Sequence, residues 1–96
     1  MATFRVDTPP HVGEVIRHLP PDLKRSIKAA LQALSRNPSL GGPLERELQG
    51  FWKCRVRRFR IVYSVDRVRR VIRIFAVGPR RGIYETVADE LIQQRS

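Results

Sequence analysis

The hydrophobic periodicity of this chain changes once along its length, and that change limits the folds it can adopt. Up to Leu34, apolar residues recur at intervals of three and four, which is the spacing of an amphipathic helix. From Trp52 onward, β-branched and aromatic residues alternate with basic ones, as they do in half-buried strands. Helices followed by strands are typical of an α+β fold, because each helix must bury its apolar stripe against a sheet.

Two helices are predicted in the first part of the chain, after a short alternating strand at residues 3–6. Thr8 supplies a capping hydroxyl before Pro9 and Pro10, which suit a first helical turn. The segment Pro20-Pro21-Asp22 ends this helix and begins a second one, which stops at Asn37-Pro38. The apolar stripe of the second helix consists of Leu23, Ile27, Leu31 and Leu34.

The second part of the chain predicts a small sheet. Residues 39–50 contain several glycines and read as a loop, in which Leu40, Leu44 and Leu48 are candidate anchors onto the core. Three strands are predicted at 52–56, 59–65 and 71–77, and the short gaps between them favour an antiparallel meander. A last helix is expected at 82–94. The predicted fold is therefore α+β, with an N-terminal strand, a helical hairpin packed on a small antiparallel β-sheet, and a C-terminal helix.

Length and composition favour a single domain over residues 1–96, since a chain of this size builds one modest core. No run approaches the roughly 20 apolar residues that a membrane span requires, and the N-terminus lacks the apolar segment of a signal peptide. The lone Cys54 cannot form an internal disulfide, which agrees with a reducing compartment. We therefore expect a cytoplasmic protein that makes no contact with a membrane.

The charge of the chain points to a polyanionic partner. Nineteen Lys and Arg against nine Asp and Glu give a net charge of +10, whose self-repulsion a nucleic acid would relieve. The distribution is uneven, because Asp66 is the only acidic residue between Lys53 and Arg81. Nucleic acid is the first candidate partner, and a merely solvated basic surface is the alternative.

Period-two alternation gathers basic residues on one face of the predicted hairpin. Lys53, Arg55 and Arg57 alternate with apolar residues in the first strand, and Arg60 of the second strand joins them if the two strands pair. By the same alternation, Arg58 is expected on the same face of the second strand as Arg60. A solvated surface role remains open for Arg57, Arg58 and the arginines that follow, while Trp52, Phe59, Tyr63 and Phe75 are expected in the core. Tyr84 suits either a half-buried position or the site.

The residue types near this face restrict the chemistry. The sequence has no phosphate-binding glycine loop, no spaced Cys or His set and no pair of carboxylates beside the basic face, so neither a cofactor nor a metal site is predicted. RNA can be cut without a metal, because its own 2′-hydroxyl attacks the adjacent phosphate once a protein aligns it and neutralises the developing charge. Arginines and a lysine are suited to that task.

Three segments together resemble the RelE branch of the RelE/ParE toxin superfamily. They are Leu48-Gln49-Gly50-Phe51-Trp52-Lys53-Cys54-Arg55-Val56, Arg60-Ile61-Val62-Tyr63 and Val77-Gly78-Pro79-Arg80-Arg81-Gly82-Ile83-Tyr84. The helical hairpin before them fits as well, so the resemblance covers nearly the whole chain. It implies a toxin of a type II toxin-antitoxin system that cleaves messenger RNA in the ribosomal A site, next to 16S rRNA. It also implies inhibition by a cognate antitoxin, which we expect to be acidic, and contact with operator DNA only through that antitoxin.

Carried over by position, the resemblance assigns Lys53, Arg60, Arg80 and Tyr84 as catalytic residues. Lys53 is the candidate base for the 2′-hydroxyl, since neighbouring arginines favour a neutral amine, while Arg60 and Arg80 hold the scissile phosphate and Tyr84 stacks on or orients a base. Further RNA or phosphate contacts are expected from Arg55, Arg57, Arg58 and Arg81.

Two departures from the family pattern bear on these assignments. Relatives place a second lysine where this chain has Arg55, and an arginine that stays protonated clamps phosphate but does not act as a base. Pro79 and Gly82 alter the backbone that presents Arg80. Two other functions stay open, a ParE-type inhibitor of DNA gyrase from the same superfamily and a non-catalytic nucleic-acid-binding protein of the same fold, for which basic charge alone would suffice.

Overall fold

The computed structural model describes residues 3–79 of the 96-residue chain. In chain order the elements are β1 (Arg5–Asp7), α1 (Pro10–Arg17), α2 (Pro21–Arg36), a 3₁₀ turn (Pro38–Leu40), β2 (Gly42–Pro43), a second 3₁₀ turn (Arg46–Leu48), β3 (Trp52–Val56), β4 (Phe59–Asp66) and β5 (Val71–Pro79). The predicted α+β architecture is confirmed, including the N-terminal strand and the helical hairpin. The helix expected at 82–94 lies outside the described residues, and a single domain over 1–96 stays a prediction.

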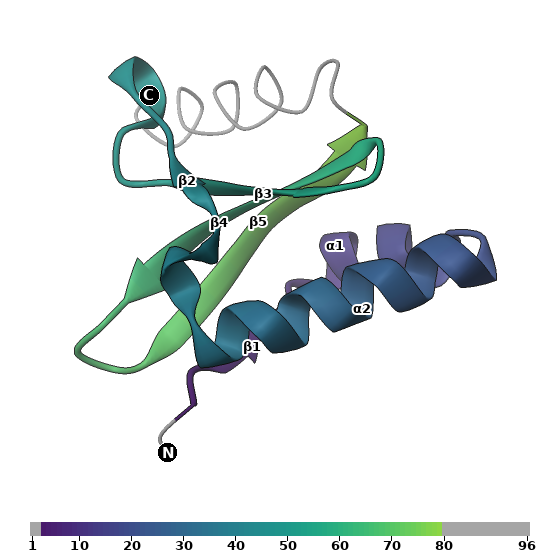
Figure 1. The fold of residues 1–96 in the computed structure, drawn as a ribbon, viewed down its shortest axis with the longest axis horizontal. Coiled ribbons are helices and arrows are strands. Elements are labelled where there is room, and N and C mark those ends of the chain that lie inside the picture. Colours follow the sequence, from purple (N-terminus) through teal and green to yellow (C-terminus); the bar gives the residue numbers. More distant parts are fainter. Residues whose placement is uncertain (1–2, 80–96) are drawn as a thin grey trace.

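The five strands form one sheet in the order β1-β5-β4-β3-β2 (Figure 1). The meander of β3, β4 and β5 is antiparallel as predicted, and β2 extends it with two residues paired to β3. At the other edge β1 runs parallel to β5, with Arg5 opposite Val71. The hydrophobic pattern of a three-residue strand does not indicate whether the strand will pair in a parallel or an antiparallel way.

Both helices lie on one face of the sheet (Figure 1). α1 and α2 each begin with a proline in the first turn, where a missing N–H costs no intrahelical hydrogen bond. The predicted cap by Thr8 is wrong. Pro9 occupies the capping position of α1 and has no side-chain hydrogen-bonding group, so the helix begins without a side-chain cap.

The main core fills the space between the helices and the sheet. Ile27 and Leu34 of the predicted stripe in α2 are fully buried, and Leu23 and Leu31 pack against the core at its border. They meet the alternate residues of β4 and β5, of which Ile61, Tyr63, Ile72 and Ile74 are buried. The apolar stripe of α2 therefore follows the helical repeat of 3.6 residues, and the inward face of the sheet follows the strand repeat of 2 residues.

The opposite face of the sheet carries a second, smaller apolar cluster. Leu48 and Val62 are buried there, with Leu44, Phe51, Phe75 and Ala76 packed around them, and the rings of Phe51 and Phe75 meet edge to face at 4.6 Å. Leu44 and Leu48 are thus anchors as predicted, but on the outer face. The prediction for Leu40 is wrong, because its side chain is 56% exposed.

Tyr63 ties the segment between α2 and β2 to the sheet. Its hydroxyl donates a hydrogen bond to the carbonyl of Pro38 at 2.7 Å and accepts one from the N–H of Gly41 at 3.2 Å. Its ring is fully buried and stacks on Trp52 at 6.4 Å. A polar group placed so deep needs such partners, because an unpaired buried hydroxyl costs free energy.

We expect Tyr63 to make the fold sensitive to alkaline pH. Burial raises the pKa of Tyr63 to about 12 from its ordinary 10.0, so the unfolded chain loses this proton first. The stabilising contribution is complete below pH 10 and is lost as the pH rises toward 12, by an amount on the order of 2 kcal/mol. Urea unfolding across this range should show the loss. Tyr63→Phe has no hydroxyl to titrate, so its free energy of unfolding should lack this loss. If the wild type and Tyr63→Phe lost the same free energy of unfolding between pH 10 and pH 12, the assignment to Tyr63 would be wrong.

The turn between β4 and β5 is held by a carboxylate. Asp66 Oδ1 accepts hydrogen bonds from the N–H groups of Val68 and Arg69 at 3.1 and 2.9 Å, and Arg70 closes the turn at a φ of 57°. This local bonding explains how a turn without glycine forms.

Asp66→Ala should lower the free energy of unfolding by about 1 kcal/mol, because two backbone donors lose their acceptor in an exposed turn. Thermal or urea unfolding measures the change. Glu45→Ala, which removes an exposed carboxylate, is the control. An equal loss in both variants would mean that charge, and not the turn, is responsible.

Candidate nucleic-acid interface

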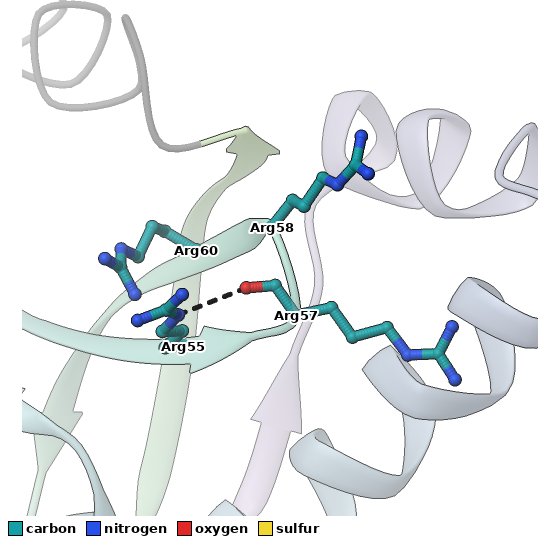
Figure 2. Close-up of a pocket in the computed structure, with 4 residues that line it drawn as sticks. All are labelled: Arg55, Arg57, Arg58 and Arg60. Carbon is teal, nitrogen blue, oxygen red and sulfur yellow. Dashed lines mark hydrogen bonds between the residues drawn. The ribbon is translucent and has the colours of Figure 1, made fainter.

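The basic face predicted from alternation is present on the outer side of the sheet. Arg55 and Arg60 are directly opposite each other in the register of β3 and β4, and Figure 2 shows their guanidinium groups side by side. Lys53 precedes Arg55 by two residues and therefore lies on the same face, where its side chain is exposed. The structure thus brings together three of the predicted site residues.

Arg57 and Arg58 form the turn that joins these strands. Arg57 adopts a φ of 54°, so it leaves the regular alternation that the sequence suggested for it. Its carbonyl accepts a hydrogen bond of 3.2 Å from Nε of Arg55, which fixes that guanidinium beside the turn (Figure 2). The side chains of Arg57 and Arg58 extend away from the Arg55–Arg60 pair, toward the helices (Figure 2).

The four arginines line a hollow of about 180 Å³, which we call the arginine pocket. Nε of Arg60 is buried and has no hydrogen-bond partner in the described part of the chain. Like charges directly opposite each other in a sheet are destabilising. An anion in the arginine pocket would relieve both penalties, since guanidinium groups bind phosphate oxygens in a planar, often bidentate way.

The acidic side chains that the structure describes do not neutralise this pocket. Their ion pairs are Arg17 with Glu14, at 2.7 Å, and Arg25 with Asp22, and both lie within the helices. Over the same residues, no group of three or more His, Cys, Asp or Glu side chains is placed to hold a metal ion. What the described face offers to a ligand is therefore positive charge and N–H donors.

Lys53 is held by close backbone packing on both sides of β3. It pairs with Val62 of β4 and with Gly42 of β2. The neighbouring Gly41 packs so closely that a Cβ atom there would collide with the carbonyl oxygen of Lys53 and with the hydroxyl of Tyr63. Sequence reasoning missed this role of Gly41, because a glycine in a loop gives no sign of what approaches it.

The remaining predicted residues, Arg80, Arg81 and Tyr84, lie outside the described residues. The last described residues belong to β5 and pair with β4, where Gly78 lies opposite Arg60 and Pro79 opposite Phe59.

Two further hollows lie on the helix side, and the sequence did not predict them. One, of about 270 Å³, is lined by Leu23, Arg57, Arg58 and Phe59. We call it the tip hollow, because it adjoins the tip of the β3–β4 hairpin. The other, of about 310 Å³, lies between α1 and α2 and has Ile16 and Leu31 beside Arg17, Lys24 and Lys28.

None of the helices in residues 3–79 has the length and apolarity needed to cross a membrane.

Solved structures share this fold. The toxin-antitoxin complex RelBE2 from Mycobacterium tuberculosis is 28% identical, with a TM-score of 0.74 over 81% of this chain and 99% of that chain. A double mutant of the Escherichia coli toxin RelE in the free state is 22% identical, with a TM-score of 0.74 over 98% of each chain. A YoeB/ParE toxin from Agrobacterium tumefaciens is 17% identical, with a TM-score of 0.68 over 79% of this chain and 98% of that chain.

The family comparison covers most of the sequence. No match was found among curated proteins. Residues 11–84, however, match the family model described as the ParE toxin of type II toxin-antitoxin system, parDE. This protein is therefore a type II toxin that belongs to the ParE toxin family, within the RelE/ParE superfamily.

Proposed function

We propose that this toxin is a ribosome-dependent endoribonuclease that cleaves messenger RNA in the ribosomal A site. The observation that carries the proposal is the arginine pocket beside Lys53, in which Arg55 and Arg60 face outward without a described acidic neighbour. A site made of cations and N–H donors suits the pentacoordinate phosphorane of RNA cleavage, because it stabilises charge that develops in the transition state. Acting on ribosomes places the protein in the cytoplasm.

In the proposed reaction the RNA supplies its own nucleophile. The 2′-oxygen attacks the adjacent phosphorus while Lys53 accepts the 2′-hydroxyl proton, and the bond from phosphorus to the 5′-oxygen breaks. The products are a 2′,3′-cyclic phosphate and a 5′-hydroxyl, whose proton comes from a general acid or from water. Arg60 and Arg80 neutralise the non-bridging oxygens, Arg55 and Arg81 bind neighbouring phosphates, and Tyr84 orients a base.

An acidic antitoxin is the proposed protein partner. The structural relative from Mycobacterium tuberculosis is a toxin-antitoxin complex. In this chain the groove between α1 and α2 combines an apolar floor at Ile16 and Leu31 with the cations Lys24 and Lys28. A segment that folds on binding, with an apolar stripe flanked by carboxylates, complements such a groove. Contact with operator DNA is proposed to occur only through this antitoxin.

Primer extension tests the activity directly. Messenger RNA is incubated with stalled ribosomes and the toxin, in parallel with Arg80→Ala and with a reaction that lacks ribosomes. We expect cleavage at A-site codons that requires both ribosomes and Arg80. Cleavage that persists in the variant would refute the role of Arg80, and no cleavage by the wild type under any condition would refute the nuclease.

A second candidate function is inhibition of DNA gyrase, which the ParE description of the matching family favours. A supercoiling assay separates the two, since a messenger RNA nuclease leaves gyrase activity intact. A non-catalytic nucleic-acid-binding protein is the third candidate, and it predicts salt-sensitive binding without cleavage on any ribosome.

A further inference from the structure

The tip hollow differs in chemistry from the arginine pocket, although the two share Arg57 and Arg58. Among the described residues, the arginine pocket is lined by four arginines, whereas Leu23 and Phe59 join Arg57 and Arg58 around the tip hollow. Both of these are partly buried at the border of the main core. Figure 2 shows Arg57 and Arg58 directed to this side of the hairpin, away from Arg55 and Arg60.

We propose that the tip hollow binds one nucleobase of an RNA strand whose phosphate lies on Arg57 or Arg58. Single-stranded RNA is recognised by stacking unpaired bases on aromatic rings and on guanidinium planes, and the hollow offers both. Phe59 and Leu23 provide the apolar surface for the base. The two arginines provide planar cations at its rim.

The size of the hollow favours a single ring system. Its volume of about 270 Å³ lies just below the roughly 300–1,000 Å³ of sites that hold drug-sized ligands. A docked peptide helix needs a groove long enough for anchors on successive turns. Among the described residues, α2 contributes only Leu23 to the tip hollow, whereas Lys24, Lys28 and Leu31 on successive turns of α2 line the groove between α1 and α2.

The position of the hollow defines where the base sits in the strand. The inference rests on the proposed function in one respect, namely that the scissile phosphate occupies the arginine pocket. The turn of Arg57 and Arg58 separates the two hollows, so a base in the tip hollow belongs to a nucleotide that flanks the scissile bond. The tip hollow would then influence which sequences are cut, without touching the reacting atoms.

Nuclear magnetic resonance on the wild-type protein tests binding without any ribosome. Three probes are titrated separately: 5′-adenosine monophosphate, inorganic phosphate and a short acidic peptide that contains leucine. We expect the nucleotide to shift the Leu23 methyl and Phe59 ring signals, and phosphate to shift arginine Nε signals alone. The inference is overturned if the nucleotide leaves Leu23 and Phe59 unmoved, or if the peptide perturbs them at lower concentration than the nucleotide does.

A matched pair of variants in α2 completes the test. Leu23→Gln should weaken nucleotide binding by roughly fivefold, because apolar surface that the base would bury is lost, and leave phosphate binding unchanged. Leu31→Gln makes the same change in the groove between the helices and should leave both unchanged. Equal weakening by the two variants would overturn the inference. Because cleavage is not measured, a toxin that fails to cut messenger RNA still gives a clear result, and an active toxin that does not bind the nucleotide refutes this inference alone.

Discussion

Arg60→Ala should lower the rate of A-site cleavage by roughly 100-fold or more, which is the usual cost of removing a preorganised donor to a transition-state anion. Nε of Arg60 is already buried without a described partner, so its desolvation cost is met before the substrate arrives. The loss should appear in the rate of single-turnover cleavage on saturated ribosomes, because the guanidinium acts on charge that develops during the reaction.

The same variant should fold as well as the wild type. Removing an unpaired guanidinium next to Arg55 relieves repulsion, so the free energy of unfolding should stay constant or rise. Arg69→Ala is the matched control, because it removes the same charge from an exposed turn at the other end of β4. If Arg69→Ala slowed cleavage as much as Arg60→Ala, the effect would be general electrostatic attraction to the ribosome, and the role of Arg60 in the transition state would be refuted.

Gly41→Ala should be the most destabilising of the glycine-to-alanine exchanges at Gly13, Gly41, Gly42 and Gly50. The backbone of Gly41 is extended, with φ of −80° and ψ of −173°, so conformation alone would admit alanine. The obstacle is contact, since the new methyl group would collide with the carbonyl of Lys53 and the hydroxyl of Tyr63. We expect a loss of about 3 kcal/mol in the free energy of unfolding, from overpacking together with weakened hydrogen bonds to Tyr63.

Gly42→Ala provides the comparison at the next residue. A Cβ at Gly42 would meet the Lys53 side chain at 3.8 Å, an ordinary van der Waals distance. The free energies of unfolding of the two variants, measured in urea, should therefore differ by most of the loss predicted for Gly41→Ala. Cleavage should also fall further in Gly41→Ala than in Gly42→Ala at temperatures where both are folded, because the strand that carries Lys53 must shift. If the two variants had similar free energies of unfolding, the backbone around Gly41 would be able to move away from the new methyl group at little cost, and the prediction would be wrong.

Local pattern was sufficient to predict the elements that position the site. The stripe of α2 and the alternation of β3 and β4 each follow from one periodicity, and a two-residue gap between the strands makes Arg55 and Arg60 neighbours. The resemblance to a known family added the order in which the basic residues occur. None of this required knowledge of contacts between distant parts of the chain.

What the sequence could not predict depends on such distant contacts. The close approach of Gly41 to Lys53, the bond from Tyr63 to Pro38 and the placement of Leu48 on the outer face each join segments that are separated in sequence. The cap predicted at Thr8 failed for a local reason, because either of two successive prolines can start a helix. The tip hollow exists only because α2 passes the end of the hairpin.

The parallel pairing of β1 with β5 also affects the order in which the protein folds during synthesis. Arg5 is made 66 positions before its strand partner Val71. The two helices form from local contacts, whereas an edge strand with such a long sequence separation can add to the sheet only after β5 has left the ribosome. The basic surface likewise waits for β4, so a nascent chain carries the helices of the toxin before it carries the arrangement of arginines on which cleavage depends.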